Sequence, residues 1–375
     1  MILTEEQTMI QDMARSFSQE KLAPNSLKWE KEGVPAEILS EMGALGLFGM
    51  CVPEEYDGAA TDYVSYALAI TEIAAGDGGL STLMSVTNSP SAACILNCGN
   101  DMQKEKFLRP MARGEWIGMF CLTEPQAGSD ASMLKTRAVK VDGGWKLNGS
   151  KQFITSGRVG KVAIVFAVTN PDAGKKGISA FIVPSDTPGF TVASVEEKMG
   201  QKSSDTCSIV FEDMIVPDEN MLGNEGDGYK IALMNLESGR IGIAAQSVGM
   251  ARAAYDYALA YAKERVAFGK PIFEQQAVSF RLADMATQIA AAEQLVLNAA
   301  ARKDAGLPCL KEACMAKLFA SEMAEKVCSD AIQTLGGYGY LSEYPVEKIA
   351  RDVRVCQIYE GTSDIQKIVI SRQIA

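Results

Sequence analysis

Hydrophobic residues in the last third of the chain recur every three or four positions, which is the spacing of one face of an α-helix. Three such stripes are present, at positions 244–259, 278–299 and 316–331. Together with a further helix after Thr362, they predict a C-terminal four-helix bundle over residues 223–375.

The first 115 residues also show helical spacing. Met9, Met13 and Phe17 are one example, and Pro53, Gly58 and Pro90 are expected to break the segment into several helices. The run Thr4-Glu5-Glu6-Gln7 is a capping-box pattern for the first helix. Residues 1–115 are therefore predicted to form an N-terminal α-helical domain.

Between these parts the pattern changes to short apolar runs. Residues 136–141 and 145–147, joined by Asp142-Gly143-Gly144, predict two strands in a hairpin. Further strands are expected at 162–168, 177–183, 190–194 and 207–211. The fold class that follows is mainly α with a central β domain, a barrel or sandwich over residues 116–222.

Composition narrows the chemistry. The 375-residue chain contains no histidine, which excludes Ser-His-Asp triads and the usual zinc sites, and we expect no metal site. Nine cysteines without a C-x-x-C motif predict reduced thiols. A net charge of -11 argues against a nucleic-acid partner. No signal peptide or apolar run of about 20 residues is visible, so we expect a soluble, cytoplasmic protein without membrane insertion.

The most suggestive stretch is 357–364, Gln-Ile-Tyr-Glu-Gly-Thr-Ser-Asp. Ile358 and Tyr359 could shield Glu360 from water, raise its pKa and make it a better base near neutral pH. Gly361 leaves the backbone free to approach a ligand or to adopt positive φ. Taken alone, the stretch could simply begin the last helix.

Two other segments offer hydroxyl groups or an aromatic ring to a ligand: the first, taken alone, is simply a loop, and the second suits a flat ring with polar edges. Residues 122–130 form a turn rich in Pro, Gly and hydroxyl side chains, and in residues 151–157 Phe153 and Thr155 fall on one face of a strand. No G-x-G-x-x-G motif occurs, so a Rossmann dinucleotide site is not supported.

Several separated motifs, in order along the whole chain, resemble the acyl-CoA dehydrogenase family. They are the T-E-P-x-A-G-S-D loop, F-I-T-S-G, Lys198-Met199-Gly200, Arg265 to Pro271, Gln333 to Gly339, and the final Y-E-G-T. The resemblance implies FAD as the cofactor and an acyl-CoA as the substrate.

The resemblance also implies roles for individual residues. Thr123, Phe153 and Thr155, with Phe120 and Leu122 in the same segment, match contacts to the flavin ring, and Ser129 matches a position near the thioester arm. FAD contacts that reach a neighbouring subunit match Arg265, Phe268, Gln276, Gln333, Gly336 and Gly337, which implies a homotetramer built as a dimer of dimers. Thr362, Ser363 and Asp364 match residues near the pyrophosphate, at a helix N-terminus. Singly, Arg265 could be a surface ion pair and Gly336-Gly337 a helix stop.

By the same resemblance, Glu360 is the base that removes the α-proton while hydride leaves the β-carbon for flavin N5, giving a trans-2-enoyl-CoA. A branch of the family carries its base at the position that Gly239 occupies here. Glu237 and Arg240 match neighbours of the CoA arm, or they form a plain helix ion pair, and Tyr359 and Gly361 are expected beside the substrate. The electron acceptor implied is an electron-transfer flavoprotein.

The run 237–246 is most similar to the short-chain and short-branched-chain members, so we expect a straight or branched acyl group of about four to six carbons. Phe153 stands where many relatives have Trp. Three alternatives stay open: an enoyl-CoA reductase running the reverse reaction, a non-catalytic flavin- or CoA-binding homologue, and an oxidase.

Overall fold

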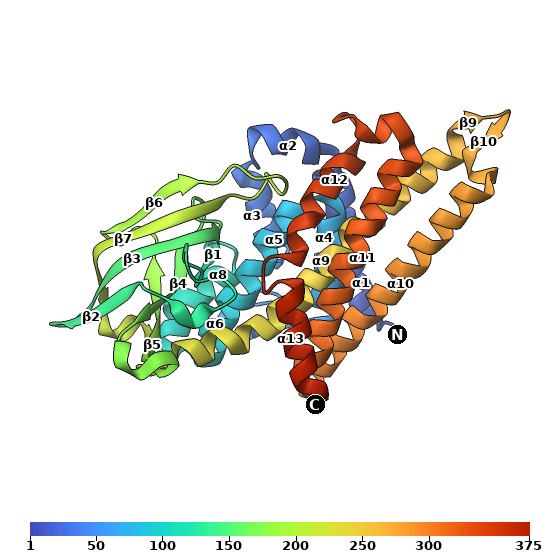
Figure 1. Ribbon diagram of the computed structural model, residues 1–375. Helices are drawn as coiled ribbons and strands as arrows, with labels where there is room; N and C mark the ends of the chain where they lie inside the picture. The colour runs from blue at the N-terminus through green and yellow to red at the C-terminus, as the bar shows by residue number, and fades with distance from the viewer.

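A computed structural model describes all 375 residues of the chain. Helices form both ends of the sequence and a β sheet forms the middle (Figure 1). The sheet lies at one end of the molecule, and the two-stranded β9–β10 hairpin projects at the other (Figure 1). This confirms the predicted order of a helical part, a β part and a second helical part.

The N-terminal helices are short, apart from α1 and α4. Thr4 caps α1 as predicted, because its hydroxyl accepts from Gln7 N at 3.2 Å and the Gln7 side chain accepts from Thr4 N at 3.1 Å. Met9, however, is 72% exposed, so it does not belong to the buried face of α1. The helices are α1 Glu5–Phe17, α2 Ser26–Glu32, α3 Ala36–Ala44, α4 Tyr63–Gly76, α5 Gly78–Val86, α6 Ala93–Cys98, α7 Asp101–Gln103 and α8 Arg109–Ala112.

The central part is one mixed sheet with the strand order β6-β7-β3-β2-β4-β5-β8, and β1 pairs with β4. Its strands are β1 Gly118–Cys121, β2 Arg137–Val141, β3 Gly144–Thr155, β4 Val162–Val168, β5 Ile178–Pro184, β6 Phe190–Val195, β7 Thr206–Pro217 and β8 Met221–Leu222. The β2–β3 hairpin is confirmed, with Val141 opposite Gly144. The pairing defines a mixed sheet and does not confirm a closed barrel.

Two strands are much longer than predicted. β3 and β7 each have 12 residues, and their pairing shifts register between Leu147 and Gly149 and again between Lys151 and Ile154. Each shift interrupts the alternation of inward and outward side chains. A search for regular alternation therefore finds only fragments of these strands.

The C-terminal part contains three long helices and two shorter ones. They are α9 Gly228–Glu264, α10 Gln276–Asp304, α11 Leu310–Leu335, α12 Pro345–Val353 and α13 Ser363–Ile374, with β9 Val266–Ala267 and β10 Lys270–Pro271 between α9 and α10. No helix is both long enough and apolar enough to cross a membrane.

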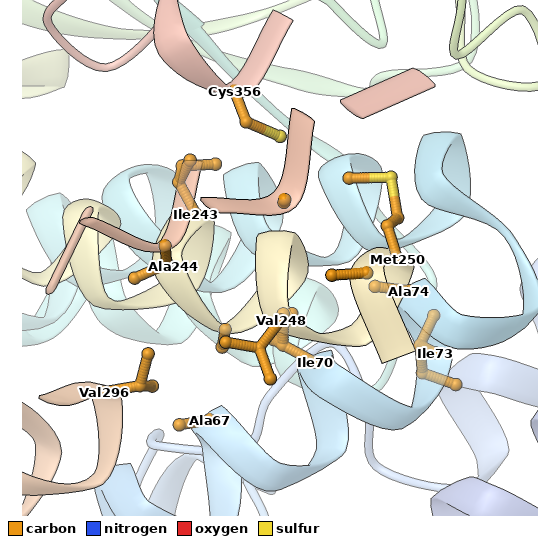
Figure 2. Close-up of a cluster of buried hydrophobic side chains, with 14 of the residues drawn as sticks. Ala67, Ile70, Ile73, Ala74, Ile243, Ala244, Val248, Met250, Val296 and Cys356 are labelled. Atoms are coloured by element: carbon orange, nitrogen blue, oxygen red, sulfur yellow. The ribbon is translucent and has the colours of Figure 1, made fainter. Parts of the chain in front are cut away.

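The two helical parts share one hydrophobic core. Ile70 on α4 and Val248 on α9 belong to the same buried cluster, with Val296 on α10 (Figure 2). The predicted stripes of α9, α10 and α11 all contribute to it. The predicted fourth helix, α13, buries only Gln366, whereas α4 packs against both α9 and α10. A four-helix bundle made by the C-terminal part alone is therefore not confirmed.

All nine cysteines are free, and seven of them are buried. The prediction of reduced thiols that fill the core agrees with this arrangement.

Candidate active site

Glu360 lies between a 3₁₀ turn, Arg354–Gln357, and the start of α13. Its backbone has φ +54°, and Gly361 has φ +89°. A positive φ is uncommon for a residue with a side chain and persists only when the surrounding structure holds it. Here Lys317 Nζ and Gln366 Nε2 both donate to the Gly361 carbonyl, at 2.7 and 2.8 Å. The turn that presents Glu360 is thus fixed from α11 and from α13.

The Glu360 carboxylate lies against α9, directly over Gly239. A Cβ built on Gly239 would lie 2.7 Å from Glu360 Cδ and 2.8 Å from Oε1, and closer still to Oε2. The absence of a side chain at 239 therefore creates the space for the carboxylate. Position 239 was expected to carry no alternative base, and in the structure the Glu360 carboxylate occupies the space that a side chain there would fill.

Glu360 Oε2 is shielded from solvent and has no hydrogen-bond partner in the chain. Burial raises the pKa of Glu360 to about 7, against the opposing effect of Arg240 and Lys317. The predicted direction of the shift is correct, but one predicted cause is not, because Ile358 is 52% exposed and does not exclude water. The ionised, basic form of Glu360 predominates above about pH 7.

Tyr359, which was expected beside the substrate, has its hydroxyl group in a buried polar network. The hydroxyl donates to Gln246 Oε1 at 2.9 Å and lies 3.2 Å from Thr82 Oγ1, and Gln201 Nε2 donates to it at 3.3 Å. The network joins α5, α9 and the turn after Lys198-Met199-Gly200. Sequence patterns did not identify Thr82, Gln201 or Gln246, because their partners lie more than 100 residues away along the chain.

Glu237 and Arg240 do not form the helix ion pair that was the alternative to a binding role. Glu237 Oε1 instead lies 3.5 Å from Lys303 Nζ and accepts from Cys309 Sγ at 3.1 Å. Arg240 is 6% exposed and its Nε has no partner. Arg240 is thus a buried cation close enough to Glu360 to lower that residue's pKa, whereas Glu237 is bound to other groups.

A buried ion pair supports the loop after β1. Lys151 Nζ lies 2.8 Å from Glu124 Oε1, and the two side chains are 0% and 2% exposed. The Glu124 carboxylate also accepts from the backbone N–H groups of Lys135 and Thr136. Although burial opposes it, these partners lower the pKa of Glu124 to about 2. These contacts therefore tie the loop to β3 and to the residues before β2 where it passes Leu122 and Thr123.

The predicted flavin-ring contacts come from this part of the sheet. Thr123 O accepts from Gln152 N at 2.9 Å, which joins the loop to β3. Phe153 has φ +59° and is 64% exposed, Ile154 is buried, and Thr155 is half-buried. Phe153 and Thr155 both remain accessible, but the positive φ and a register shift between Lys151 and Ile154 interrupt the regular alternation on which their predicted common face depended. Leu122 is buried, and Phe120 is half-buried against Phe166 with ring centroids 5.0 Å apart, whereas Ser129 is exposed.

A second set of predicted cofactor contacts lies at the far end of the molecule. A cavity of about 430 Å³ is lined there by Arg265, Gln333, Gly336, Gly337 and Tyr338, among others. Arg265 stacks over the Tyr338 ring at 5.7 Å and forms no ion pair. Gly336 has φ +62° and also ends α11, so the helix-stop interpretation holds together with the cavity.

Phe268 and Gln276 of this second set are exposed. Phe268 lies at the tip of the β9–β10 hairpin with 97% of its surface accessible, and Gln276 begins α10. The 37 residues of α9 span about 55 Å between the sheet end and this hairpin. Within one chain, the contacts predicted near the sheet and those predicted near the hairpin therefore lie at opposite ends of α9 (Figure 1).

The third predicted set begins α13. Thr362 caps the helix by accepting from Ile365 N at 3.3 Å. Ser363 Oγ is buried without a partner, and Asp364 is exposed.

Models of known protein families match almost the whole chain. Residues 4–115, 119–214 and 226–375 match the models of the N-terminal, middle and C-terminal domains of acyl-CoA dehydrogenases. The chain belongs to the acyl-CoA dehydrogenase family. It is therefore an acyl-CoA dehydrogenase-type oxidoreductase, and members of this family are FAD-dependent flavoproteins.

Relatives cover the whole chain. It is 49% identical over 375 residues to an acyl-CoA dehydrogenase of Bacillus subtilis, covering 100% of the chain and 99% of the relative. It is 46% identical to a short-chain specific acyl-CoA dehydrogenase of Megasphaera elsdenii, covering 98% of the chain and 97% of the relative.

Solved structures show the same fold. Butyryl-CoA dehydrogenase from Megasphaera elsdenii superposes with a TM-score of 0.98 at 45% identity, covering 100% of the chain and 99% of that protein. A chain in a structure described as "Electron transferring flavoprotein of Acidaminococcus fermentans: Towards a mechanism of flavin-based electron bifurcation" also gives 0.98 at 45% identity, covering 100% of the chain and 98% of the other.

The residues present fit FAD. The cavity near Arg265 offers a guanidinium group, an amide and two glycines without neighbours that would restrict access, which suits an anionic, polar ligand. Beside Thr155, the buried Ser156 hydroxyl has no partner in the chain. Both features leave hydrogen-bonding capacity for a bound group.

The sequence analysis missed one charged residue at the site, Lys317. It occupies the buried face of α11 together with Ala313, Ala320 and Ala324, and it is 0% exposed. A lysine within an apolar stripe is the signal that could have identified it, because lysine is rarely buried without a specific partner.

Proposed function

We propose that the protein dehydrogenates a short-chain acyl-CoA to the trans-2-enoyl-CoA, with Glu360 as the base that removes the α-proton. The observation that carries this proposal is the shielded Glu360 carboxylate, held over Gly239 with one oxygen unpaired and its pKa raised to about 7. An unpaired carboxylate with such a pKa can accept a proton from carbon at neutral pH.

The chain supplies orientation as well as the base. The backbone N–H of Glu360 makes no hydrogen bond within the chain, so it is free to donate to the thioester oxygen and stabilise developing enolate charge. Arg240 and Lys317 favour the ionised form of the carboxylate before the reaction. The segments around Thr123 and Thr155 would hold FAD, which would supply the acceptor for the β-hydride.

A small acyl group is favoured by what lies next to Glu360. Gly242 follows Gly239 by three residues on α9, so it faces the same side of the helix, and it lies against Tyr66 and Ser85, whose side chains are fully buried. The space beyond the carboxylate is therefore filled on that side. The short-chain specificity named for the Megasphaera elsdenii relative supports the same proposal.

The test is a panel of acyl-CoAs of graded length and branching, scored by bleaching of the flavin absorbance and by turnover with an artificial acceptor. We expect the highest kcat/KM for straight or branched acyl groups of about four to six carbons, where pocket size discriminates by roughly 10–200-fold per methylene. Glu360→Gln should bind the same ligands without bleaching. A preference for long acyl chains would contradict the size argument, and bleaching in Glu360→Gln would contradict the assignment of the base.

We also propose a homo-oligomer, a tetramer built as a dimer of dimers, in which the Arg265 end of one subunit completes the cofactor site of another. The separation of the two contact sets along α9 supports this, as do the exposed Phe268, Phe280 and Tyr340 at that end. An electron-transfer flavoprotein is the proposed acceptor. Phe268→Asp should weaken both oligomerisation and FAD retention, and a variant that keeps both would contradict the arrangement.

The reverse reaction, reduction of an enoyl-CoA, is a second candidate. At a pKa of about 7, Glu360 is present as both acid and base near neutral pH, so the same group can take or deliver the α-proton. Rates with acyl-CoA plus an oxidised acceptor and with enoyl-CoA plus a reduced donor distinguish the two directions.

A further inference from the structure

Lys317 is a fully buried lysine without a carboxylate partner. It is 0% exposed and forms none of the ion pairs in the structure. Its ammonium group donates to the Gly361 carbonyl at 2.7 Å. Burying an ammonium group is unfavourable unless a specific interaction offsets the lost hydration. The contact with the Gly361 carbonyl is therefore the interaction that offsets the lost hydration of this ammonium group.

The contacted carbonyl belongs to the turn that presents Glu360. Both residues of this turn have positive φ, +54° at Glu360 and +89° at Gly361. Gln366 Nε2 donates to the same carbonyl at 2.8 Å and to the Glu360 carbonyl at 3.1 Å. The turn is thus held by Lys317 on α11, which precedes it in the sequence, and by Gln366 on α13, which follows it.

Titratable and charged groups from several elements face this position. Arg240 comes from α9, Cys314 from α11 itself, Cys356 from the 3₁₀ turn before Glu360, and Tyr66 from α4. Burial lowers the pKa of Lys317 to about 8, so the ammonium form still predominates at pH 7. Among these groups only Arg240 and Lys317 act to lower the pKa of Glu360.

We propose that Lys317 is a positioning residue for Glu360: it fixes the Glu360–Gly361 turn through the Gly361 carbonyl, and its buried positive charge favours the ionised form of the Glu360 carboxylate. This inference rests on the proposed role of Glu360 as the base. Lys317 does not reach the reacting atoms in this role, and it acts through the residue that does.

The test separates the charge from the hydrogen bond. Lys317→Met removes both, and Lys317→Gln removes the charge but keeps an N–H donor. Lys326→Met is the matched control, because Lys326 lies on the same helix but is 60% exposed and pairs with Asp330 and Asp284. Each variant is prepared with FAD, and kcat and kcat/KM for butyryl-CoA are measured between pH 5.5 and 9.

Removing a cation near a carboxylate raises the pKa of that carboxylate. The acidic limb of kcat/KM should therefore move up by about one pH unit in both Lys317 variants. The value of kcat at high pH, where Glu360 is ionised in every variant, should fall about tenfold or more in Lys317→Met and less in Lys317→Gln, because only the latter still holds the turn. KM should change little, and Lys326→Met should match the parent protein throughout.

An unchanged acidic limb in a folded, FAD-loaded Lys317→Met protein would overturn the role of the charge. If that variant does not fold, Lys317→Gln carries the same test of the pH limb. Glu360→Gln separates this inference from the proposed function. If Glu360→Gln keeps its turnover, the base assignment fails and the inference fails with it. If Glu360→Gln is inactive and the Lys317 variants keep the parent profile, only the inference fails.

Discussion

Gly239→Ala should reduce activity strongly while leaving the fold intact. The new Cβ would lie 2.7 Å from Glu360 Cδ and 2.8 Å from Oε1, and real Cβ atoms essentially never come within 3.0 Å of another heavy atom. The carboxylate is the end of a flexible side chain, so it can yield by on the order of 1 Å. A displacement of that size at a reacting group costs roughly 100-fold in rate.

The expected effect on stability is small, because two contributions oppose each other. Alanine is favoured over glycine in a helix interior by about 1 kcal/mol, and this gain offsets part of the strain from moving the carboxylate. We therefore expect the free energy of unfolding to change by no more than about 1 kcal/mol, measured by urea denaturation, while kcat/KM for butyryl-CoA falls about 100-fold.

A second variant tests whether the loss arises at Glu360. Glu360→Asp shortens the side chain by one methylene and withdraws the carboxylate from Gly239. If the two groups compete for one space, the double variant Gly239→Ala/Glu360→Asp should lose less activity than the product of the single losses. Parent-like turnover in Gly239→Ala, or fully additive losses in the double variant, would refute the inference that the carboxylate lies over position 239.

The other predictions concern the base, the flavin and the supporting ion pair. Glu360→Gln should lower kcat by about 10²–10⁴-fold, and the parent protein's kcat/KM should rise with pH through about 7, because the base must be ionised; a flat profile in stopped-flow assays would contradict this. Because the pKa of Glu360 is higher in the folded than in the unfolded chain, the group costs stability progressively as pH rises from about 4.5 to 7, and melting temperatures of Glu360→Gln should lack that loss. Thr155→Val should weaken FAD binding or shift the flavin spectrum, and unchanged affinity and spectrum by titration would remove that contact. Glu124→Gln leaves Lys151 buried without a carboxylate, so denaturation should show a loss of about 3–5 kcal/mol, whereas a loss below 1 kcal/mol would show that the ion pair contributes little.

Periodicity in the sequence identifies buried faces but not the elements that cover them. The stripe from Val278 to Ala299 predicted a helix with one apolar face, and α10 has that face. The pattern carried no information that α4, from the first hundred residues, would pack against it. In the sheet, the register shifts in β3 concealed most of a 12-residue strand, because alternation is lost wherever pairing is irregular.

At the active site, too, local sequence predicted some features, and contacts between distant segments determine the others. Local sequence predicted Glu360 and the raised pKa, since a carboxyl group next to aromatic and glycine residues suggests a shielded base. It could not predict Lys317, whose contact with Gly361 joins residues 44 positions apart. It also attributed the shielding to Ile358, which is exposed, whereas the carboxylate lies against Gly239 on a distant helix.

The core shared by the two helical parts has a consequence during synthesis. Twelve of the 14 residues of α4 are buried in the finished protein, largely against α9, yet roughly 150 residues separate the end of α4 from the start of α9. At translation rates of about 5–20 residues per second, α4 must wait on the order of ten seconds for its packing partner to leave the ribosome. During that time the nascent chain exposes an apolar helix, so ribosome-stalled fragments that end before Gly228 should bind chaperones or aggregate.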